Sequence, residues 1–403
     1  MRRAVALIAI STAFGGCAWV ERASMPSGHP VTPGLEANSS SARPALADGG
    51  RFVAFESLAS NLVASDTNNA ADVFVRDLAL DVTERVSLTN DDLQVANGGT
   101  APAISDDGRL VLFLTAAQLS AADTDSQTDI YVRDRSLGTT TLRSDSFTAL
   151  PPPYPAALAE YPVTQPTISG DGSTIAFNVT IAFQGVNVTI GPFVTASGPA
   201  SLTPHGRLFP NRPSLSDDGS RIAWTSYDVI GTDAEMQSII VDTNTNALVA
   251  FVDGGFVTHQ SQGGFAVELS GDGGFAVTSR TAVGHGEVLR YDVAADELTS
   301  VVTNVDFLRH ISISDDGARV GFIGIRDGVH ALWLVEPGTA TPPRPLSTDP
   351  LGSSATSVNE GVLSGNGEWG AFTTIDPSIA PFDDNPFADV FVRSVDVTLE
   401  GPS

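Results

Sequence analysis

The stretch Ala103-Ile104-Ser105-Asp106-Asp107-Gly108-Arg109-Leu110-Val111-Leu112-Phe113 places a Ser-Asp-Asp-Gly turn between two apolar runs. Glycine adopts positive φ without steric cost, and aspartate hydrogen bonds within its own turn, so this stretch predicts a tight β-hairpin. Related turns recur along the chain, and we take the glycine of each turn as an anchor. The seven anchor glycines are Gly50, Gly108, Gly172, Gly219, Gly273, Gly317 and Gly367.

The spacing of the anchor glycines indicates the architecture. Consecutive anchors are separated by between 44 residues, from Gly273 to Gly317, and 64 residues, from Gly108 to Gly172. Four short strands and their turns occupy about 40 to 50 residues in a propeller blade. The 38 glycines and 25 prolines in 403 residues are also typical of a turn-rich β-protein. The sequence therefore predicts an all-β fold, a seven-bladed β-propeller of four-stranded antiparallel blades.

Two further strands are expected in each blade. A run rich in β-branched and aromatic residues follows the hairpin, which predicts a third strand. This run is clearest at residues 72–77, 129–134, 238–242 and 389–393. The fourth strand is expected at Thr83-Glu84-Arg85-Val86-Ser87 in the first blade.

The seventh blade has to find its fourth strand elsewhere, because the chain ends soon after the third strand of that blade. Residues 20–24, Val-Glu-Arg-Ala-Ser, match residues 83–87 and precede the first hairpin. We expect them to form the outer strand of the seventh blade, so that the N- and C-terminal segments pair, close the ring and leave no open inner edge. Residues 395–397 are the competing candidate for that strand.

The N-terminus has the pattern of an export signal. Two arginines at positions 2 and 3 precede an apolar segment, Ala4 to Phe14, that is too short to span a bilayer. The segment ends in Phe14-Gly15-Gly16-Cys17, which resembles a bacterial lipobox, and Cys17 is the only cysteine of the chain. We expect lipidation of Cys17; an ordinary signal peptidase site, with Cys17 left free or removed, is the alternative.

These features give a domain division and a location. Residues 1–17 are expected to be a lipoprotein signal peptide, and residues 18–403 a single propeller domain. The protein is then an exported periplasmic or cell-surface lipoprotein, at the outer membrane rather than the inner one, touching the membrane through its lipid alone and monomeric. The formal charge of −26, from 47 acidic and 21 basic residues, opposes binding to phosphate backbones, so nucleic acid is not an expected partner.

The chain resembles a known repeat family. The stretch from Ala54 to Val63, the run Asp72-Val73-Phe74-Val75-Arg76-Asp77 and the Ser-Asp-Asp-Gly turns resemble the TolB-like, WD-like β-propeller repeat of bacterial exported proteins. The resemblance covers nearly the whole mature chain and is weakest in blades three and five. It implies a propeller in the envelope that acts as a binding scaffold for a protein, a peptidoglycan component or a glycan. Fold alone does not identify the partner.

Three loops have a pattern of oxygen donors before the third strand. Ca²⁺ prefers several carboxylate, amide and carbonyl oxygens, and a one-three spacing on a turn directs successive donors to one point. Asp and Asn in such loops also cap turns without metal, and both interpretations remain open. The candidate metal ligands are Asp66, Asn68 and Asp72, then Asp123, Asp125 and Asp129, and finally Asp383, Asn385 and Asp389.

The mouth of the central channel is the second candidate site. Residues seven positions before the anchor glycines are expected to ring it, and five of them are polar. Two arginines with a histidine suit a carboxylate or an acidic sugar. Alternatively, these side chains only solvate the ends of the strands. The five candidate ligand-binding residues are Arg43, Gln165, Arg212, His310 and Glu360.

Catalysis is not expected from the sequence. It contains no Gly-x-Ser-x-Gly motif and no pair of histidines at metal-ligand spacing. We therefore expect a protein that is not an enzyme, with no catalytic residues and no cofactor other than Ca²⁺. The alternative is a polysaccharide lyase or hydrolase that acts on acidic sugars in the funnel through His310, Arg212 and Glu360.

Overall fold

The computed structural model describes residues 20–27, 36–144, 163–183, 186–195, 201–202, 212–230, 233–258, 266–282, 285–349, 351–380 and 383–395. Within these stretches the chain forms β-strands joined by turns and loops, with no α-helix. No segment in this part of the chain is therefore a helix of the length and apolarity needed to cross a bilayer. The all-β class predicted from the sequence is confirmed.

The first four sheets each contain four antiparallel strands in chain order. The first sheet consists of β2 (Ser41–Leu46), β3 (Phe52–Ser57), β4 (Asp72–Asp77) and β5 (Val82–Arg85). The second sheet consists of β6 (Thr100–Ile104), β7 (Leu110–Thr115), β8 (Asp129–Asp134) and β9 (Thr139–Leu142). The next two sheets consist of β10 (Val163–Ile168), β11 (Ile175–Phe183), β12 (Val186–Thr195) and β13 (Ser201–Leu202), and of β14 (Ser214–Leu215), β15 (Arg221–Ile230), β16 (Asp233–Asp242) and β17 (Leu248–Thr258).

A seven-stranded sheet follows. It is this large because one long strand, β21, pairs with a different neighbour along each half of its length. Strand β21 pairs with β20 up to Val305 and with β22 from Asp306 onward. The strands of this sheet are β18 (Val267–Leu269), β19 (Phe275–Ala282), β20 (His285–Asp292), β21 (Glu297–Ile313), β22 (Val320–Arg326), β23 (Val329–Val335) and β24 (Arg344–Pro345).

The last sheet combines the two ends of the described chain, and we call it the terminal sheet. Its strands, in the order β1-β27-β26-β25, are β1 (Val20–Arg22), β27 (Asp389–Ser394), β26 (Trp369–Thr374) and β25 (Gly361–Leu363). Strand β1 pairs antiparallel with β27, with Val20 opposite Arg393 and Arg22 opposite Phe391. This is the pairing predicted for residues 20–24. Of the competing segment 395–397, only Val395 lies within the described residues.

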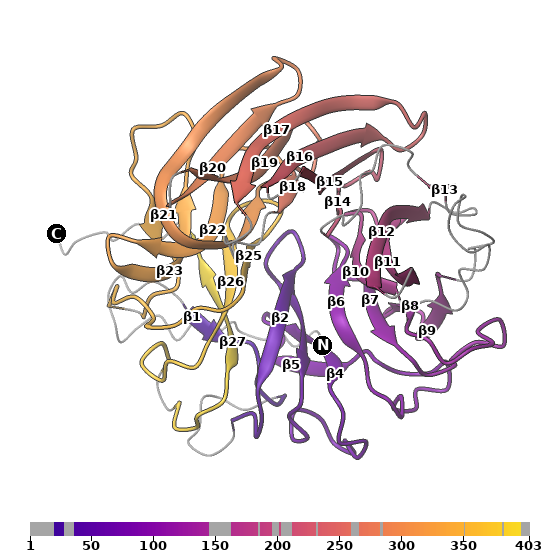
Figure 1. Ribbon diagram of the computed structural model, residues 1–403. Coiled ribbons are helices and arrows are strands. Elements are labelled where there is room, and N and C mark those ends of the chain that lie inside the picture. The colour runs from indigo at the N-terminus through magenta and orange to yellow at the C-terminus, as the bar shows by residue number, and fades with distance from the viewer. Residues whose placement is uncertain are drawn as a thin grey trace, which may run out of the picture.

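The sheets follow one another around a common centre (Figure 1), with their first strands toward the middle. There, backbone hydrogen bonds join the turns of successive hairpins, between neighbouring sheets and, from Asp272 to Asp315, within the seven-stranded sheet. These bonds run from Asp48 to Asp106, Asp106 to Gly170, Asp171 to Asp217, Asp217 to Gly271, Asp272 to Asp315 and Asp315 to Gly365.

The anchor glycines have the backbone conformation that the sequence predicted. All seven have positive φ, between 63° at Gly219 and 73° at Gly172. Their lack of a side chain matters as well, because a Cβ on Gly108 would lie 2.2 Å from the ring of Phe52 in the preceding sheet. The predicted capping is also present: in the second sheet, Asp107 accepts hydrogen bonds from the Ser105 hydroxyl and from the backbone N–H of Arg109. The turn and the contact between sheets therefore depend on the same glycine.

Aromatic side chains fill the space between the sheets. Rings from the second and third strands stack within a sheet, as Phe55 does on Phe74 and Phe372 on Phe391, with centroids 5.9 Å and 5.7 Å apart. All four of these side chains are fully buried. Burying a large ring stabilises a fold by roughly 1.5–3 kcal/mol, so these stacked pairs contribute much of the hydrophobic energy of each sheet.

Buried arginines on the third strands fasten loops to the sheets. In the second sheet, Arg133 donates to the carbonyl of Thr89, at 3.1 Å, and to that of Gly138, at 2.9 Å. Arg76 reaches the carbonyl of Pro26 in the same way, and Arg393 reaches that of Thr348. In each case the loop leads toward the sheet that holds the arginine, so the guanidinium links the two.

The variant Arg133→Met tests this link. It keeps the length of the side chain but removes its donors to Thr89 and Gly138, and charged hydrogen bonds of this kind contribute about 1.5–3 kcal/mol each. We expect the free energy of unfolding, from urea denaturation, to fall by roughly that amount. The control is Arg109→Met, which removes a half-exposed ion pair with Asp134 in the same sheet and should change stability little. Equal losses in both variants would contradict the role of Arg133.

Candidate functional site

The residues predicted to ring the channel lie in an irregular part of the first strands. Four residues at this repeat position have positive φ: 53° at Arg43, Ala101 and Gln165, and 37° at His310. The pairing register shifts at the same place in β2, β6, β10 and β21. Such a bulge takes the backbone N–H of the residue out of the ladder and changes the direction of its side chain.

Arg43 and Glu360 are brought together. The backbone N–H of Arg43 donates to Oε2 of Glu360, which belongs to the terminal sheet. In the same manner, the N–H of Ala101 donates to Oε2 of Glu56 at 3.0 Å, and Glu56 also lies 3.5 Å from the guanidinium of Arg43. A carboxylate from one sheet thus caps the bulge of the next. Sequence reasoning missed Glu56, which lies on the second strand.

Arg212 and His310 form a second group, with Glu268. Desolvation, and then the positive charges of Arg212 and Arg309, lower the pKa of His310. Burial raises the pKa of Glu268, against the opposite effects of Arg212 and of a hydrogen bond with Ser214. His310 is therefore held neutral near pH 7, and the charge of Arg212 acts on both His310 and Glu268.

Gln165 is not part of either group. Its side-chain carbonyl accepts a hydrogen bond from Nδ2 of Asn178, 2.9 Å away, in the neighbouring strand of its own sheet. Of the five predicted channel residues, the structure thus brings Arg43 close to Glu360 and Arg212 close to His310.

A second set of channel residues was not predicted. Asp48, Asp106, Asp217 and Asp315 stand two positions before their anchor glycines, and we call them the turn aspartates. In the other three turns this position is Gly170, Gly271 or Gly365. These glycines leave space for the carboxylates: a Cβ at Gly170 would lie 1.9 Å from Asp106, one at Gly271 2.1 Å from Asp217, and one at Gly365 2.5 Å from Asp315.

The turn aspartates repel one another across the channel. Desolvation first, and then the negative charges of the other turn aspartates and of adjacent acids, raise the pKa of Asp106 and of Asp315 to about 7. The pKa of Asp217 is raised to about 6, with Asp48 the leading charge after desolvation. The sequence does contain a signal for this group: the position two residues before each anchor glycine is either Asp or Gly.

The acidic loop of the first sheet is a self-contained network. The strand-leading Asp72 accepts hydrogen bonds from Ser87 and from the amide nitrogens of Asn68 and Gln94. Gln94 also donates to Asp66, at 2.8 Å, and Arg85 lies within 3.5 Å of both carboxylates. Amide and guanidinium donors thus surround both carboxylates of this loop.

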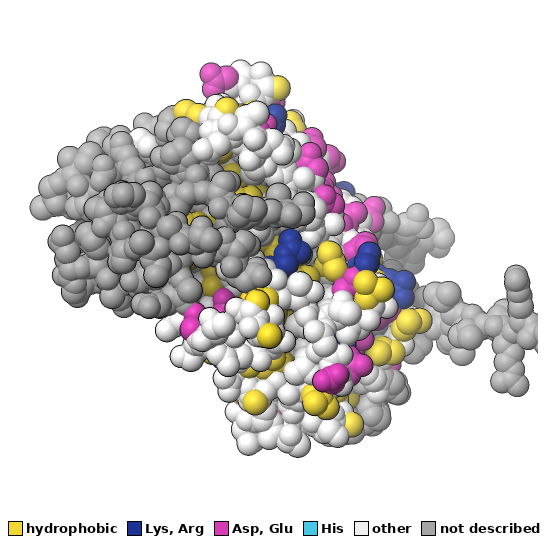
Figure 2. Space-filling view, turned by 90° about the vertical axis from the view of Figure 1, so that its right-hand side faces the viewer, with side chains coloured by type: hydrophobic (Ala, Val, Ile, Leu, Met, Phe, Trp, Pro, Cys, Tyr) yellow, Lys and Arg dark blue, Asp and Glu magenta, His cyan; other side chains and the backbone are white. Residues whose placement is uncertain are grey.

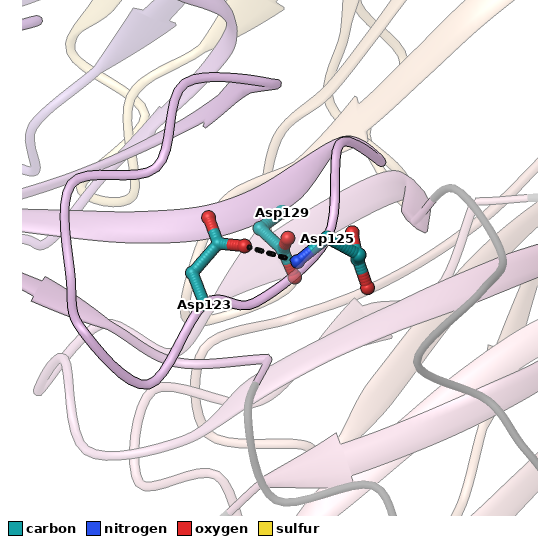
Figure 3. Close-up of side chains that lie close together, drawn as sticks. All are labelled: Asp123, Asp125 and Asp129. Carbon is teal, nitrogen blue, oxygen red and sulfur yellow. Dashed lines mark hydrogen bonds between the residues drawn. The ribbon is translucent and has the colours of Figure 1, made fainter.

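The acidic loop of the second sheet has lost two of those donors. Leu142 stands where Arg85 stands in the first sheet, and Asp125 stands where Asn68 stands. Asp123, Asp125 and Asp129 therefore lie together (Figure 3), each offering a carboxylate oxygen within 4.8 Å of the others. Asp123 accepts a hydrogen bond from Tyr131, at 2.7 Å, and its Oδ1 accepts one from the backbone N–H of Asp125. Asp129 accepts one from Ser144.

The acidic loop of the terminal sheet differs again. Asp383 and Asp389 surround the guanidinium of Arg22, and Asn385 donates to Glu36 rather than to a strand-leading aspartate. The structure therefore places the nine predicted ligands in three separate loops with three different sets of neighbours. Cys17, the predicted lipidation site, lies outside the described residues.

The surface agrees with the composition of the chain. On the flank seen in Figure 2, acidic side chains recur across the described part, with few basic ones between them. All 21 basic residues of the chain are arginines. Such a surface disfavours polyanions except where arginines gather, as they do at the channel.

Comparison with known proteins identifies the fold. No protein-family model matches the chain, and no curated protein matches its sequence. Among solved structures, an oligogalacturonate lyase from Vibrio parahaemolyticus has a TM-score of 0.55 at 10% identity, over 94% of this chain and 97% of that one. An acylaminoacyl peptidase has a TM-score of 0.54 at 12% identity, over 89% of this chain and 51% of the peptidase. The β-propeller domain of the Trilobed protease from Pyrococcus furiosus has a TM-score of 0.52 at 12% identity, over 90% and 99%.

Likeness at these identities establishes the fold and no more. The chain has the β-propeller fold, as the resemblance to TolB-like repeats implied. The similar structures include both hydrolytic and lyase enzymes, and a propeller fold occurs with many functions.

The turn aspartates predict how stability depends on pH. The pKa values of Asp106, Asp217 and Asp315 in the folded state, about 6 to 7, exceed the value of about 3.9 expected in the unfolded chain. Between about pH 4 and pH 7 the folded state holds more protons than the unfolded state, so stability falls as the pH rises and levels off above pH 7. The double variant Asp106→Asn/Asp315→Asn should therefore raise the melting temperature at pH 8 and lose this advantage at pH 4.

The matched control for this experiment is Asp91→Asn, at an exposed loop position. Its melting temperature should follow that of the wild type at every pH. A double variant that is no more stable than the wild type at pH 8 would show that the turn aspartates do not repel one another in solution.

Proposed function

We propose that this protein is an exported β-propeller scaffold that binds an envelope protein, a peptidoglycan component or a glycan at the mouth of its channel. The observation that supports this most is that Arg43 and His310 lie at bulges of the first strands, where Arg43 meets Glu360 and the charge of Arg212 reaches His310. Arg43, Arg212 and His310 are exposed, so their donors are accessible to a ligand. A carboxylate or acidic sugar is the chemistry that two guanidinium groups and a neutral imidazole recognise.

Seven blades in a closed ring are part of this proposal. The seven-stranded sheet divides into two four-stranded blades that share β21, because the partner of β21 changes between Val305 and Asp306. Closure is supported by Gly50, where a Cβ would lie 2.2 Å from Trp369 of the terminal sheet, which repeats the contact between Gly108 and Phe52. The backbone hydrogen bond from Ser41 to Ala388 joins the same two sheets.

Export and lipid attachment complete the proposal. The apolar segment before Cys17 and the small residues beside that cysteine support a lipoprotein signal at residues 1–17 and a propeller domain at residues 18–403. Strand β1 begins three residues after Cys17, so a lipid there would hold the propeller close to the membrane surface. A location at the outer membrane, on its periplasmic or outer face, follows from the same motif.

Calcium is proposed as a structural ion of the acidic loops. Three carboxylates within 4.8 Å in the second sheet support it, because Ca²⁺ binds several hard oxygens at once. The loop of the first sheet, with its own cation Arg85, is the weakest candidate.

A lyase acting on acidic sugars is the second candidate function. It is favoured by the fold similarity to an oligogalacturonate lyase and by the neutral state of His310, which could accept a proton near pH 7. Arg212 would then hold the sugar carboxylate. The two functions differ in whether a bound acidic sugar is cleaved.

Binding at the channel mouth is tested with the unlipidated propeller, beginning at residue 18. Immobilised wild-type protein should retain a component from envelope extract, purified peptidoglycan or an acidic polysaccharide panel, and Arg212→Ala should reduce its retention at least tenfold. Arg109→Ala, beside the hairpin turn at the opposite end of β6 from Ala101, is the matched control and should bind as the wild type does. Equal retention by all three proteins would contradict the proposed site. Release of unsaturated sugar ends from the panel would instead support the lyase.

Lipid attachment is tested in cells. Full-length protein should incorporate labelled palmitate and fractionate with membranes, and Cys17→Ala should abolish incorporation because no other cysteine is present. Antibody accessibility on intact cells then separates the outer face from the periplasmic face. Labelling that persists in Cys17→Ala would exclude Cys17 as the site.

A further inference from the structure

The described chain begins at one particular end of the terminal sheet. Strand β1 starts at Val20, which lies opposite Arg393 near the end of β27. Directly after β27, the backbone N–H of Val395 donates to the carbonyl of Glu368, the residue that follows the anchor glycine Gly367. The N-terminal segment therefore leads to the end of the terminal sheet at which the anchor turn lies.

The other sheets place a second set of hairpins at this same end. We call the turns that join the third and fourth strands the outer hairpins. The first residue of an outer hairpin donates its backbone N–H to the residue that follows the anchor glycine. These bonds run from Leu78 to Arg51, Arg135 to Arg109, Thr243 to Ser220 and Val293 to Gly274. Because backbone hydrogen bonds also join successive anchor turns, the anchor turns and outer hairpins share one face of the propeller, which we call the turn face.

Exposed leucines stand at the tips of two outer hairpins on this face. Leu80 is 66% exposed in the first sheet, and Leu137 is 67% exposed in the second. Each stands three residues after the aspartate that ends the third strand, Asp77 or Asp134. Single exposed leucines are ordinary on protein surfaces, but these two share one repeat position. The repeat therefore places the same apolar residue on the turn face twice.

The sheets that carry these leucines are the ones next to the start of the chain. Two further described outer hairpins follow a strand-ending aspartate, Asp242 or Asp292, and they have the smaller residues Thr245 and Ala295 at this position. The leucines belong instead to the first sheet, which lies beside the terminal sheet, and to the second sheet, which lies beside the first. The apolar tips thus accompany the N-terminal segment.

The acids of these two hairpins are neutralised locally. Asp77 and Asp134 are 6% and 8% exposed, and each accepts hydrogen bonds from two backbone N–H groups of its own hairpin. Arginines pair with the hairpin aspartates: Arg51 with Asp77, Arg76 with Asp81, and Arg109 with Asp134. The tips can therefore enter a lipid headgroup region without carrying an unpaired carboxylate into it.

We propose that the turn face rests on the bilayer that holds the lipid of Cys17, with the hairpin tips at Leu80 and Leu137 in contact with it. The inference rests on the proposed lipid attachment. Cys17 precedes Val20 by three residues, which reach at most about 11 Å, so the lipid begins beside these hairpins. A lipid together with apolar side chains holds a protein at a membrane more firmly than either does alone.

A bilayer suits these tips better than a protein partner does. A stable protein interface buries a contiguous apolar core, whereas these leucines stand on separate hairpins of separate sheets. Contact with lipid requires no matching shape. The channel residues Arg43 and His310 precede the anchor turns on their strands, at the opposite end. The channel mouth then faces away from the membrane, toward the partner that it binds.

The experiment uses the full-length lipidated protein in phosphatidylcholine vesicles. Lipidation blocks the thiol of Cys17, the only cysteine, so one introduced cysteine is a unique site for the fluorophore nitrobenzoxadiazole. Ala79→Cys places the label beside Leu80. The matched control is Leu58→Cys, at a residue 57% exposed at the opposite end of the same sheet, where the backbone N–H donates to Ser40. A doxyl-labelled lipid in the vesicles should reduce emission roughly threefold at position 79 and little at position 58.

A second variant tests the leucines themselves. In the Ala79→Cys protein, the double substitution Leu80→Ser/Leu137→Ser should remove about half of the quenching, because the tips lose their apolar contact with the bilayer. Both side chains are exposed, so the melting temperature and the incorporation of palmitate should stay unchanged.

Three results would overturn the proposal. Quenching at position 58 that equals or exceeds that at position 79 would mean that the turn face is not the membrane side. Quenching at neither position would mean that the propeller stands clear of the bilayer, and quenching that the serine substitutions leave intact would mean that the lipid alone sets the orientation. Failure to incorporate palmitate would instead remove the proposed lipid and the membrane contact together. Retention of a partner by the unlipidated propeller is a separate measurement that none of these results affects.

Discussion

The fold depends on how closely each inner turn approaches the sheet before it. A turn at this place needs a residue with φ near +70°, and it must also leave room for the neighbouring side chain. At Gly50, Gly108 and Gly317 an added Cβ would lie 2.2 Å from an aromatic ring of the preceding hairpin, which belongs to the adjacent sheet at Gly50 and Gly108. Glycine is the one residue that meets both requirements. The missing side chain of the anchor glycine therefore permits both the hairpin turn and the close contact with the neighbouring ring. This double requirement explains why these turns recur with so little change in sequence.

The repeat keeps the backbone of each turn the same but allows the residues beside the anchor glycine to differ. At the channel, the position two residues before the anchor is either aspartate or glycine. Gly170 and its equivalents provide space that the aspartate of the preceding turn occupies. The carboxylates gathered there repel one another and cost stability near neutral pH. Groups held at an energetic cost around an axis are common at functional sites. The bulges at Arg43 and His310 also lie on first strands.

The sequence was sufficient for features that depend on local pattern. Positive φ at the anchor glycines, the third strands at Asp72–Asp77 and Asp129–Asp134, and the pairing of Val20–Arg22 with β27 all follow from short motifs that repeat. Features that depend on distance in space were missed. Glu36 and Asp383 are far apart in sequence, and no short motif connects them. The shared strand Glu297–Ile313 was missed as well, because its change of partner between Val305 and Asp306 has no counterpart in the repeat pattern.

The terminal sheet differs from the others because it must bring together both ends of the chain. Only three residue pairs join β1 to β27. Pairing these strands closes a loop that includes nearly the whole chain, and such a closure has an entropic cost. Contacts between Glu36 and residues 384 and 385 add to that short ladder. In the first sheet, Gln94 completes the corresponding network by donating to both aspartates. In the terminal sheet, Glu36 lies 3.6 Å from Arg22 instead. The terminal sheet therefore joins the two ends of the described chain through a short backbone ladder and a buried group of charged side chains around Arg22.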